Sequence, residues 1–202
     1  MRLLWLGLVL VCTVASAQIG PVPGLGPIIL GGISQGFQNL ISISLTTNAA
    51  TQGGIMRREI ITSAVLNPIS DGHVRVTFTP PTTGNNTTYS AVWIGEASGT
   101  GVNYNGGQVQ LKFGGSSSVT LTAGGSTVTS DSTSFTYTSG TSIVVCFDPG
   151  ATSDVRYVSG LSSVNYSDYT KSGTGECPNT TVSGYSSSSG QTAVLSLIEV
   201  GP

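Results

Sequence analysis

Charged residues are scarce in this sequence: Asp, Glu, Lys and Arg make up only 8% of the 202 residues. Seven Lys and Arg against nine Asp and Glu give a net charge of −2, so no basic excess is available to neutralise a phosphate backbone. We therefore expect no nucleic-acid partner. Glycine, serine and threonine abound instead, which favours an extracellular β-protein over a cytosolic enzyme or a disordered acidic chain.

Histidine occurs only once, as His73, and this excludes a closed zinc site built on histidines. Calcium is the remaining alternative, because Asp131, Asp148, Asp154 and Asp168 lie in or beside predicted turns. They lack the Asp-x-Asp-x-Asp spacing of a calcium loop, and turn formation explains aspartate at such places without an ion. We expect no metal and no other cofactor.

No apolar run is long enough to cross a bilayer, which takes about 20 residues. The run from Leu3 to Val11 follows Arg2 and precedes the small residues Ala15-Ser-Ala17, an arrangement typical of a secretory signal peptide. We predict a signal peptide over residues 1–17, no transmembrane segment, and an extracellular or cell-wall location.

Cysteine occurs three times, and Cys12 would leave with the signal peptide. We expect the remaining pair, Cys146 and Cys177, to form one disulfide in an oxidising compartment. Four glycosylation sequons lie in turn-rich polar stretches, at Asn85, Asn86, Asn165 and Asn179. Sequons also arise by chance in a chain rich in serine and threonine, so the occupancy of each stays open.

Residues 18–40 combine glycine and proline at a density that prevents a regular helix or a central strand. The segment is also apolar and almost uncharged, unlike a solvated linker. It is interpreted either as a tail packed along the following domain or as an arm for self-association or for contact with a wall surface.

Short β-branched segments separated by Gly, Pro, Asn or Asp follow from residue 41 onward. Val74, Val76 and Phe78 alternate with polar residues, as in an antiparallel sheet with one solvated face. The predicted strands are 41–46, 55–63, 73–79, 89–97, 108–113, 118–123, 134–137, 141–147, 154–159 and 192–200. About ten strands at this spacing predict an all-β fold, a two-sheet antiparallel β-sandwich of jelly-roll type over residues 41–202.

Several short blocks occur in a telling order: Met56-Arg-Arg-Glu-Ile-Ile-Thr-Ser63, Gly72-His-Val-Arg-Val-Thr-Phe78, Ile94-Gly-Glu-Ala97, Leu111-Lys-Phe-Gly-Gly115, Ser118-Val-Thr-Leu-Thr-Ala-Gly124 and Val128-Thr-Ser-Asp131. With them, the chain from about Ile55 resembles the N-terminal β-sandwich that precedes the catalytic domain in secreted SGNH/GDSL-type hydrolases. The resemblance implies the same sandwich fold. In the family the catalytic Gly-Asp-Ser follows the last strand of the sandwich, whereas this sequence ends at Pro202, shortly after the predicted strand 192–200. The resemblance therefore also implies an accessory module without its hydrolase.

Catalysis in that family needs a serine after Gly-Asp, oxyanion donors from glycine and asparagine, and a histidine that takes the serine proton. His73 begins a strand whose alternation turns it to solvent, and it matches a variable sandwich position. Ser130-Asp131-Ser132 lacks the glycine and matches another sandwich segment. We assign no catalytic residue and expect no ester hydrolysis.

Binding is the function that remains, and aromatic rings that stack on sugars would supply it, with amides and hydroxyls as hydrogen-bonding partners. We expect Trp93, within a strand, to pack in or against the sandwich. The segment 156–169 interleaves tyrosines with Arg156 and other polar groups, and two more tyrosines stand in loops. The candidate ligand-binding residues are Tyr157, Asn165, Tyr166, Asp168, Tyr169, Tyr104 and Tyr185. Tyrosine is also common in strands for packing alone, so a core role stays open for each.

Three hypotheses follow. The first is a secreted, non-catalytic module that binds carbohydrate, either cell-wall polysaccharide or glycoprotein glycan. The second is a structural or self-associating extracellular protein, favoured by the apolar segment and the low charge. The third is an inactive remnant of an SGNH-type esterase.

Overall fold

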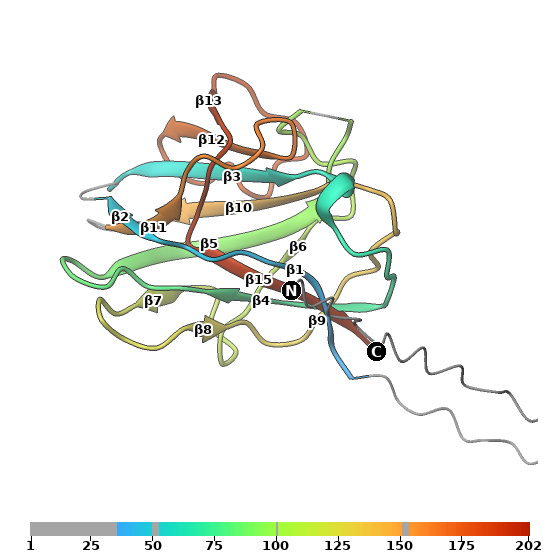
Figure 1. Ribbon diagram of the computed structural model, residues 1–202, viewed down its shortest axis with the longest axis horizontal. Coiled ribbons are helices and arrows are strands. Elements are labelled where there is room, and N and C mark those ends of the chain that lie inside the picture. Colours follow the sequence, from blue (N-terminus) through green and yellow to red (C-terminus); the bar gives the residue numbers. More distant parts are fainter. Residues whose placement is uncertain (1–35, 50–52, 100, 151–153) are drawn as a thin grey trace, which may run out of the picture. The chain divides into compact units, whose positions relative to one another are not determined.

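The fold is all-β with antiparallel pairing throughout, as predicted. The computed structural model describes residues 36–49, 53–99, 101–150 and 154–202, which form fifteen strands in three sheets (Figure 1). Its single helical turn among these residues is the 3-10 segment Ser63–Val65. None of the helical structure described is long and apolar enough to cross a membrane. The predicted signal peptide and residues 18–35 of the predicted apolar segment lie outside the described residues.

The strands divide into a five-stranded, a seven-stranded and a three-stranded sheet. The five-stranded sheet has the order β1 (Gln38–Ser42), β15 (Leu195–Gly201), β4 (His73–Phe78) and β8 (Val128–Thr129), and β9 (Thr133–Ser134) also pairs with β4. The seven-stranded sheet runs β13 (Ser186–Ser189), β12 (Tyr166–Ser172), β3 (Ile55–Ile61), β10 (Ile143–Pro149), β5 (Thr87–Glu96) and β6 (Val109–Gln110), and β7 (Val119–Leu121) also pairs with β5. The third sheet is β14 (Thr192–Ala193), β11 (Val155–Val158) and β2 (Thr47–Ala49).

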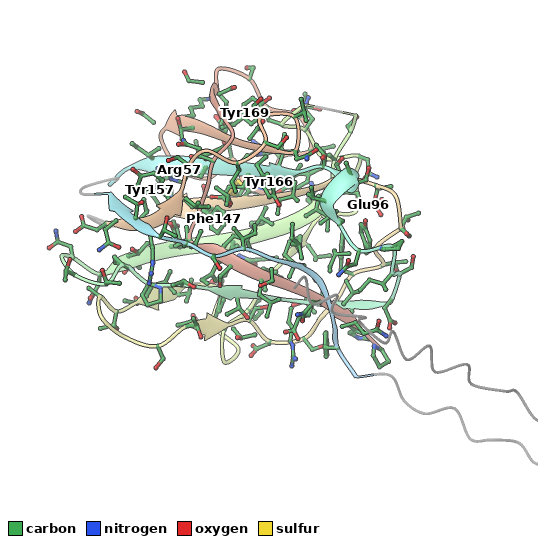
Figure 2. All side chains as sticks on the ribbon, viewed as in Figure 1. Arg57, Glu96, Phe147, Tyr157, Tyr166 and Tyr169 are labelled. Atoms are coloured by element: carbon green, nitrogen blue, oxygen red, sulfur yellow. A yellow bond between two sulfur atoms is a disulfide. The ribbon has the colours of Figure 1, made fainter. Side chains whose placement is uncertain are left out.

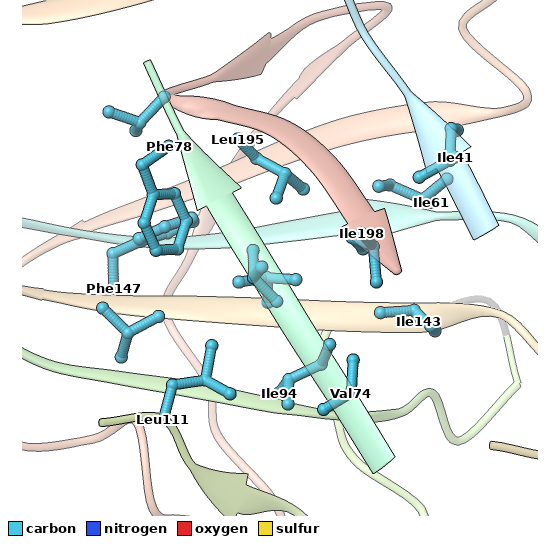
Figure 3. Packing of buried hydrophobic residues seen from close by; sticks show 14 of the residues in the cluster. Ile41, Ile61, Val74, Phe78, Ile94, Leu111, Ile143, Phe147, Leu195 and Ile198 are labelled. Atoms are coloured by element: carbon cyan, nitrogen blue, oxygen red, sulfur yellow. The ribbon is translucent and has the colours of Figure 1, made fainter. Parts of the chain in front are cut away.

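One large apolar cluster joins the two larger sheets (Figure 3). From the five-stranded sheet it takes Val74 and Phe78 of β4 and Ile198 of β15, and from the seven-stranded sheet Ile94 and Phe147. The apolar residues of β4 therefore face the core, as the alternation of its sequence predicted. Sheets that share one core in this way form a β-sandwich.

Strand β10 is buried on both faces, which explains the unbroken apolar run from Ile143 to Phe147. Val145 and Phe147 belong to the large cluster between the sheets, whereas Val144 and Cys146 belong to a second, smaller cluster on the opposite face. The seven-stranded sheet therefore has an inner face toward the five-stranded sheet and an outer face toward this smaller cluster. Trp93 packs against the outer cluster, in agreement with its expected packing role.

The strand count and the sheet count differ from the prediction of about ten strands in two sheets. Strands β12 and β13 are missing from the prediction because their sequences are polar and show no apolar alternation. The predicted strand 154–159 becomes β11 and pairs with β2 and β14, so it forms a third sheet. Strand β1 begins at Gln38, inside the predicted apolar segment, and Leu40 of that strand is fully buried.

The predicted disulfide is present: Cys146 of β10 is bonded to Cys177, and both side chains are fully buried in the outer cluster. Reduction is expected to destabilise the fold by about 3 to 4 kcal/mol, because the bond joins residues 31 positions apart and so closes a loop in the unfolded chain. That loss corresponds to a fall on the order of 10 °C in melting temperature. Scanning calorimetry with and without reductant measures it, and mass spectrometry that finds two free thiols in the non-reduced protein would contradict the pairing.

Candidate functional site

Charged residues lie on both faces of β3, although the strand is buried in the middle of the seven-stranded sheet. Successive side chains of a strand point to opposite faces, so Arg57 and Glu59 share the inner face and Arg58 lies on the outer face. All three are less than 10% exposed. Charged residues are seldom buried to this degree unless they are paired, and each of these three has partners.

Arg57 and Glu59 form a polar group with Asp168 of the neighbouring strand β12, which stands opposite Glu59 in the register. The guanidinium of Arg57 makes a buried ion pair with Asp168. Glu59 reaches the third sheet instead: its Oε1 accepts the backbone N–H of Ala193 at 2.6 Å, and its Oε2 accepts the hydroxyl of Thr192. Glu59 thereby ties β14 to β3.

Burial and the nearby Asp168 raise the pKa of Glu59 to about 8, well above its usual range. Burial also raises the pKa of Asp168, against the opposing effect of the Arg57 charge. Asp168 has the direct contact with the cation, and Glu59 does not. We therefore assign the negative charge of this pair to Asp168 at neutral pH and the proton to Glu59. In the protonated form Oε2 carries the hydrogen and donates it to the Thr192 hydroxyl oxygen, which reverses the direction of that bond.

An open pocket of about 200 Å³ lies beside this ion pair. Strand β12 supplies Asp168 to the pocket. Strand β3 supplies Arg57, and the third sheet supplies the aromatic ring of Tyr157 (Figure 2). We call it the Arg57–Asp168 pocket, and its lining residues are Arg57, Val155, Tyr157, Asp168, Gln191, Thr192 and Ala193. A cation, a carboxylate, an amide, a hydroxyl and an aromatic ring thus converge on one small space.

Arg58 lies on the outer face, where it is fully buried among backbone carbonyls. It donates to the carbonyls of Val102 at 2.9 Å, Glu176 at 2.8 Å and Asn179 at 2.7 Å. Its guanidinium carbon also lies 4.6 Å from the ring centre of Tyr104, and 5.9 Å from that of Tyr185. We call this arrangement the Arg58 cage. It fastens to β3 the loop that contains Val102 and the loop that contains Glu176 and Asn179.

The structure separates the tyrosines predicted to form one binding surface. Tyr166 packs against the large inner cluster and Tyr169 against the outer one, because residues three apart in a strand point to opposite faces (Figure 2). Only Tyr157 lines the pocket. Tyr104, a loop residue among the predicted ligand-binding residues, is buried against Arg58, and Tyr185 is half-buried near the same cation.

Asp168 is also placed differently from the expectation of a surface ligand, since it is almost fully buried in its ion pair and still lines the pocket. Asn165 lies apart from the pocket lining, and its side-chain oxygen accepts the Thr62 hydroxyl at 3.1 Å. The other three sequon asparagines, Asn85, Asn86 and Asn179, are exposed.

The four candidate calcium ligands serve different loops. Asp131 accepts the backbone N–H groups of Gly114 and Gly115, Asp148 accepts that of Gly175, and Asp154 accepts that of Asn85. Asp168 pairs with Arg57. Within the described residues, no cluster of three His, Cys, Asp or Glu side chains could hold a metal ion.

Ser130 and His73 have structural surroundings. The Ser130 hydroxyl accepts the backbone N–H of Val76 at 3.0 Å and donates to the backbone carbonyl of Asp131. His73 begins β4 and is half-exposed, opposite Ser134 in the register. These bonds join β4 to the neighbouring loop.

Arg57, Gln191 and Thr192 are pocket residues that the sequence prediction missed. The signal that could have found Arg57 is the cluster Arg57-Arg58-Glu59, three charges inside an otherwise apolar strand of a chain with few charges. No comparable signal marks Gln191 or Thr192, because an uncharged glutamine and the first threonine of the predicted strand 192–200 carry no pattern that points to a ligand site.

No model of a known protein family matches this sequence, and a search of curated proteins found no match. The resemblance to the SGNH/GDSL accessory sandwich therefore stays a prediction.

Proposed function

We propose that the protein is a secreted, non-catalytic β-sandwich module that binds carbohydrate in the Arg57–Asp168 pocket. The observation that carries the proposal is the convergence of the Tyr157 ring with the Arg57–Asp168 pair and with Gln191 and Thr192. An aromatic ring offers a face to the C–H groups of a sugar, while carboxylate, guanidinium, amide and hydroxyl groups match its hydroxyls.

The size of the pocket favours one sugar ring. Its volume of about 200 Å³ is smaller than the roughly 300 to 1,000 Å³ of sites that enclose a drug-sized ligand. A terminal residue of a polysaccharide or glycoprotein glycan fits this scale. The ion pair also supports the proposal, because Arg57 is held in place by Asp168 before any ligand arrives, and a pre-ordered site loses less entropy on binding.

Extracellular location is supported by the buried Cys146–Cys177 disulfide, since such bonds persist in oxidising compartments. The exposed sequon asparagines Asn85, Asn86 and Asn179 are reachable for glycan attachment, and Asn165 is less so because it is half-buried. Self-association has less support: among the described residues Val164 is the one strongly exposed large apolar side chain.

Glycan binding is tested with the purified mature protein on an array of polysaccharides and glycans, followed by titration of the retained ligand. Tyr157→Ala is expected to weaken binding at least about tenfold, a loss of roughly 1.4 kcal/mol, because the stacking face is removed. Tyr157→Phe keeps that face and is expected to bind nearly as the wild type does.

Tyr169→Ala is the matched control, since this ring lies on the other face of the seven-stranded sheet. Because Tyr157 also contacts the core, Gln191→Ala gives a second variant, and melting curves show that each protein is folded. Full affinity in both folded pocket variants would rule out this pocket. Retention of no glycan at all would refute carbohydrate binding.

A further inference from the structure

Strand β11 presents two neighbouring residues to two different spaces. Tyr157 lines the Arg57–Asp168 pocket, and Arg156, which points to the opposite face of the strand, lines a separate open hollow of about 580 Å³. We call it the Arg156 hollow. Its lining residues are Thr79, Pro80, Pro81, Thr82, Gly124, Gly125, Ser126, Thr127 and Arg156.

Arg156 differs from the other arginines of the described chain in having no acceptor. Arg57 pairs with Asp168, Arg58 donates to carbonyls, and Arg75 makes a two-point ion pair with Glu199 at 2.7 and 3.0 Å. The Nε–H of Arg156 is shielded from water and makes no hydrogen bond to any described residue, which is also true of the Nε–H of Arg58. Arg58 donates through its other guanidinium nitrogens, whereas the side chain of Arg156 makes no hydrogen bond at all to the described residues. Buried polar groups without a partner are uncommon in folded proteins, so the unpaired guanidinium of Arg156 calls for an explanation, and a ligand that accepts from it would supply one.

The surroundings of Arg156 suit a negatively charged group. None of the described residues that line the hollow is acidic, and four of them carry hydroxyls that can donate hydrogen bonds. The nearest acid in sequence, Asp154, turns its carboxylate to the backbone N–H of Asn85 at 2.8 Å. A guanidinium offers parallel N–H donors that match the two oxygens of a carboxylate or a sulfate.

The rim of the hollow is fixed before any ligand binds. Asn48 of β2 stands opposite Arg156 in the register. Its side-chain amide donates to the hydroxyl of Thr82 and accepts the backbone N–H of Thr82 at 3.2 Å. Thr82 is thereby held at the edge of the hollow beside the arginine.

We propose that the Arg156 hollow is a second binding site, which takes an oxyanion group, carboxylate or sulfate, carried by an acidic polysaccharide. Arg156 supplies the charge and two of the hydrogen bonds, and the threonine and serine hydroxyls supply others. The oxyanion site stands on the hollow alone, whereas the polysaccharide as its source rests on the proposed function.

The oxyanion site is tested by nuclear magnetic resonance of the ¹⁵N-labelled protein, titrated with sodium sulfate and with sodium acetate. Absence of a signal in Arg156→Lys assigns the Nε–H resonance of Arg156. A saturable shift of this resonance is expected with at least one of the two anions and not with sodium chloride at equal ionic strength. The lack of a saturable shift with both anions would overturn the proposal.

The source of the oxyanion is tested with three oligosaccharides of matched length, one neutral, one uronate and one sulfated. Arg156→Gln is expected to lose about tenfold affinity for the uronate or for the sulfated ligand and to bind the neutral one unchanged. Equal loss for all three, or no loss for any, would overturn the polysaccharide assignment. Tyr157→Ala separates the two sites. If Tyr157→Ala weakens binding and Arg156→Gln does not, the assignment of polysaccharide to the Arg156 hollow is refuted, while the proposed function is retained.

Discussion

Replacement of Arg58 by alanine is expected to lower the free energy of unfolding by about 3 to 5 kcal/mol. This is a large part of the roughly 5 to 15 kcal/mol by which a folded domain is stable. The variant leaves the carbonyls of Val102, Glu176 and Asn179 without their donor. It also opens a space beside the ring of Tyr104. Urea unfolding of the two proteins measures the difference, and failure of the variant to be secreted in folded form agrees with it.

Arg156→Ala is the matched control, because the side chain of this arginine donates no hydrogen bond within the described residues and its removal is expected to change stability by less than about 1 kcal/mol. Arg58→Lys keeps the charge, but a lysine ammonium lacks the planar guanidinium that lets Arg58 bind three carbonyls. We therefore expect an intermediate loss of folding free energy. A stability of Arg58→Ala equal to that of Arg156→Ala would show that the Arg58 cage does not hold the loops.

Stability is expected to fall as the pH rises from about 5 to about 9. The pKa of Glu59 is raised from 4.5 to about 8 in the folded protein, so the folded state holds a proton that the unfolded state releases over this range. The stabilisation is complete below the unfolded value and is lost as the pH passes through the folded value. The expected loss is on the order of 4 kcal/mol, measured by urea unfolding at pH 5 and pH 9.

Glu59→Gln isolates this effect. A glutamine keeps an oxygen for the N–H of Ala193 and an amide that can donate to the hydroxyl of Thr192, but it has no titrating proton. We expect the variant to show a nearly flat stability over the same range and to exceed the wild type at pH 9. A wild-type stability that stays constant or increases with pH would contradict the protonated state of Glu59, as would an unchanged slope in Glu59→Gln.

Strands in which apolar and polar side chains alternate could be predicted from the sequence. Strands that are held mainly by backbone hydrogen bonds could not. Val74, Val76 and Phe78 gave the correct inner face of β4, and the pairing of Cys146 with Cys177 followed from their number. The polar strand Ser186–Ser189 could not be predicted, because it is held by backbone hydrogen bonds to β12 rather than by an apolar face.

The candidate site was only partly accessible to sequence reasoning. Tyr157 and Asp168 were among the predicted residues, but the reason for choosing them, an exposed tyrosine cluster, does not describe their surroundings. The pocket depends on β14 lying against β3 through Glu59, a contact between residues more than 130 positions apart. A linear pattern carries no information about such a contact.

The position of β3 also sets the order in which the chain can fold. Its neighbours in the sheet, β10 and β12, begin at Ile143 and Tyr166, and the carbonyls that receive Arg58 include those of Glu176 and Asn179. A chain that has been synthesised only as far as β5 therefore lacks both strands that pair with β3. It also lacks the carbonyls that accept hydrogen bonds from Arg58. Contacts of this sequence separation slow folding. Completion of the core must thus wait until most of the polypeptide has been synthesised, which leaves β3 in need of protection from aggregation during that interval.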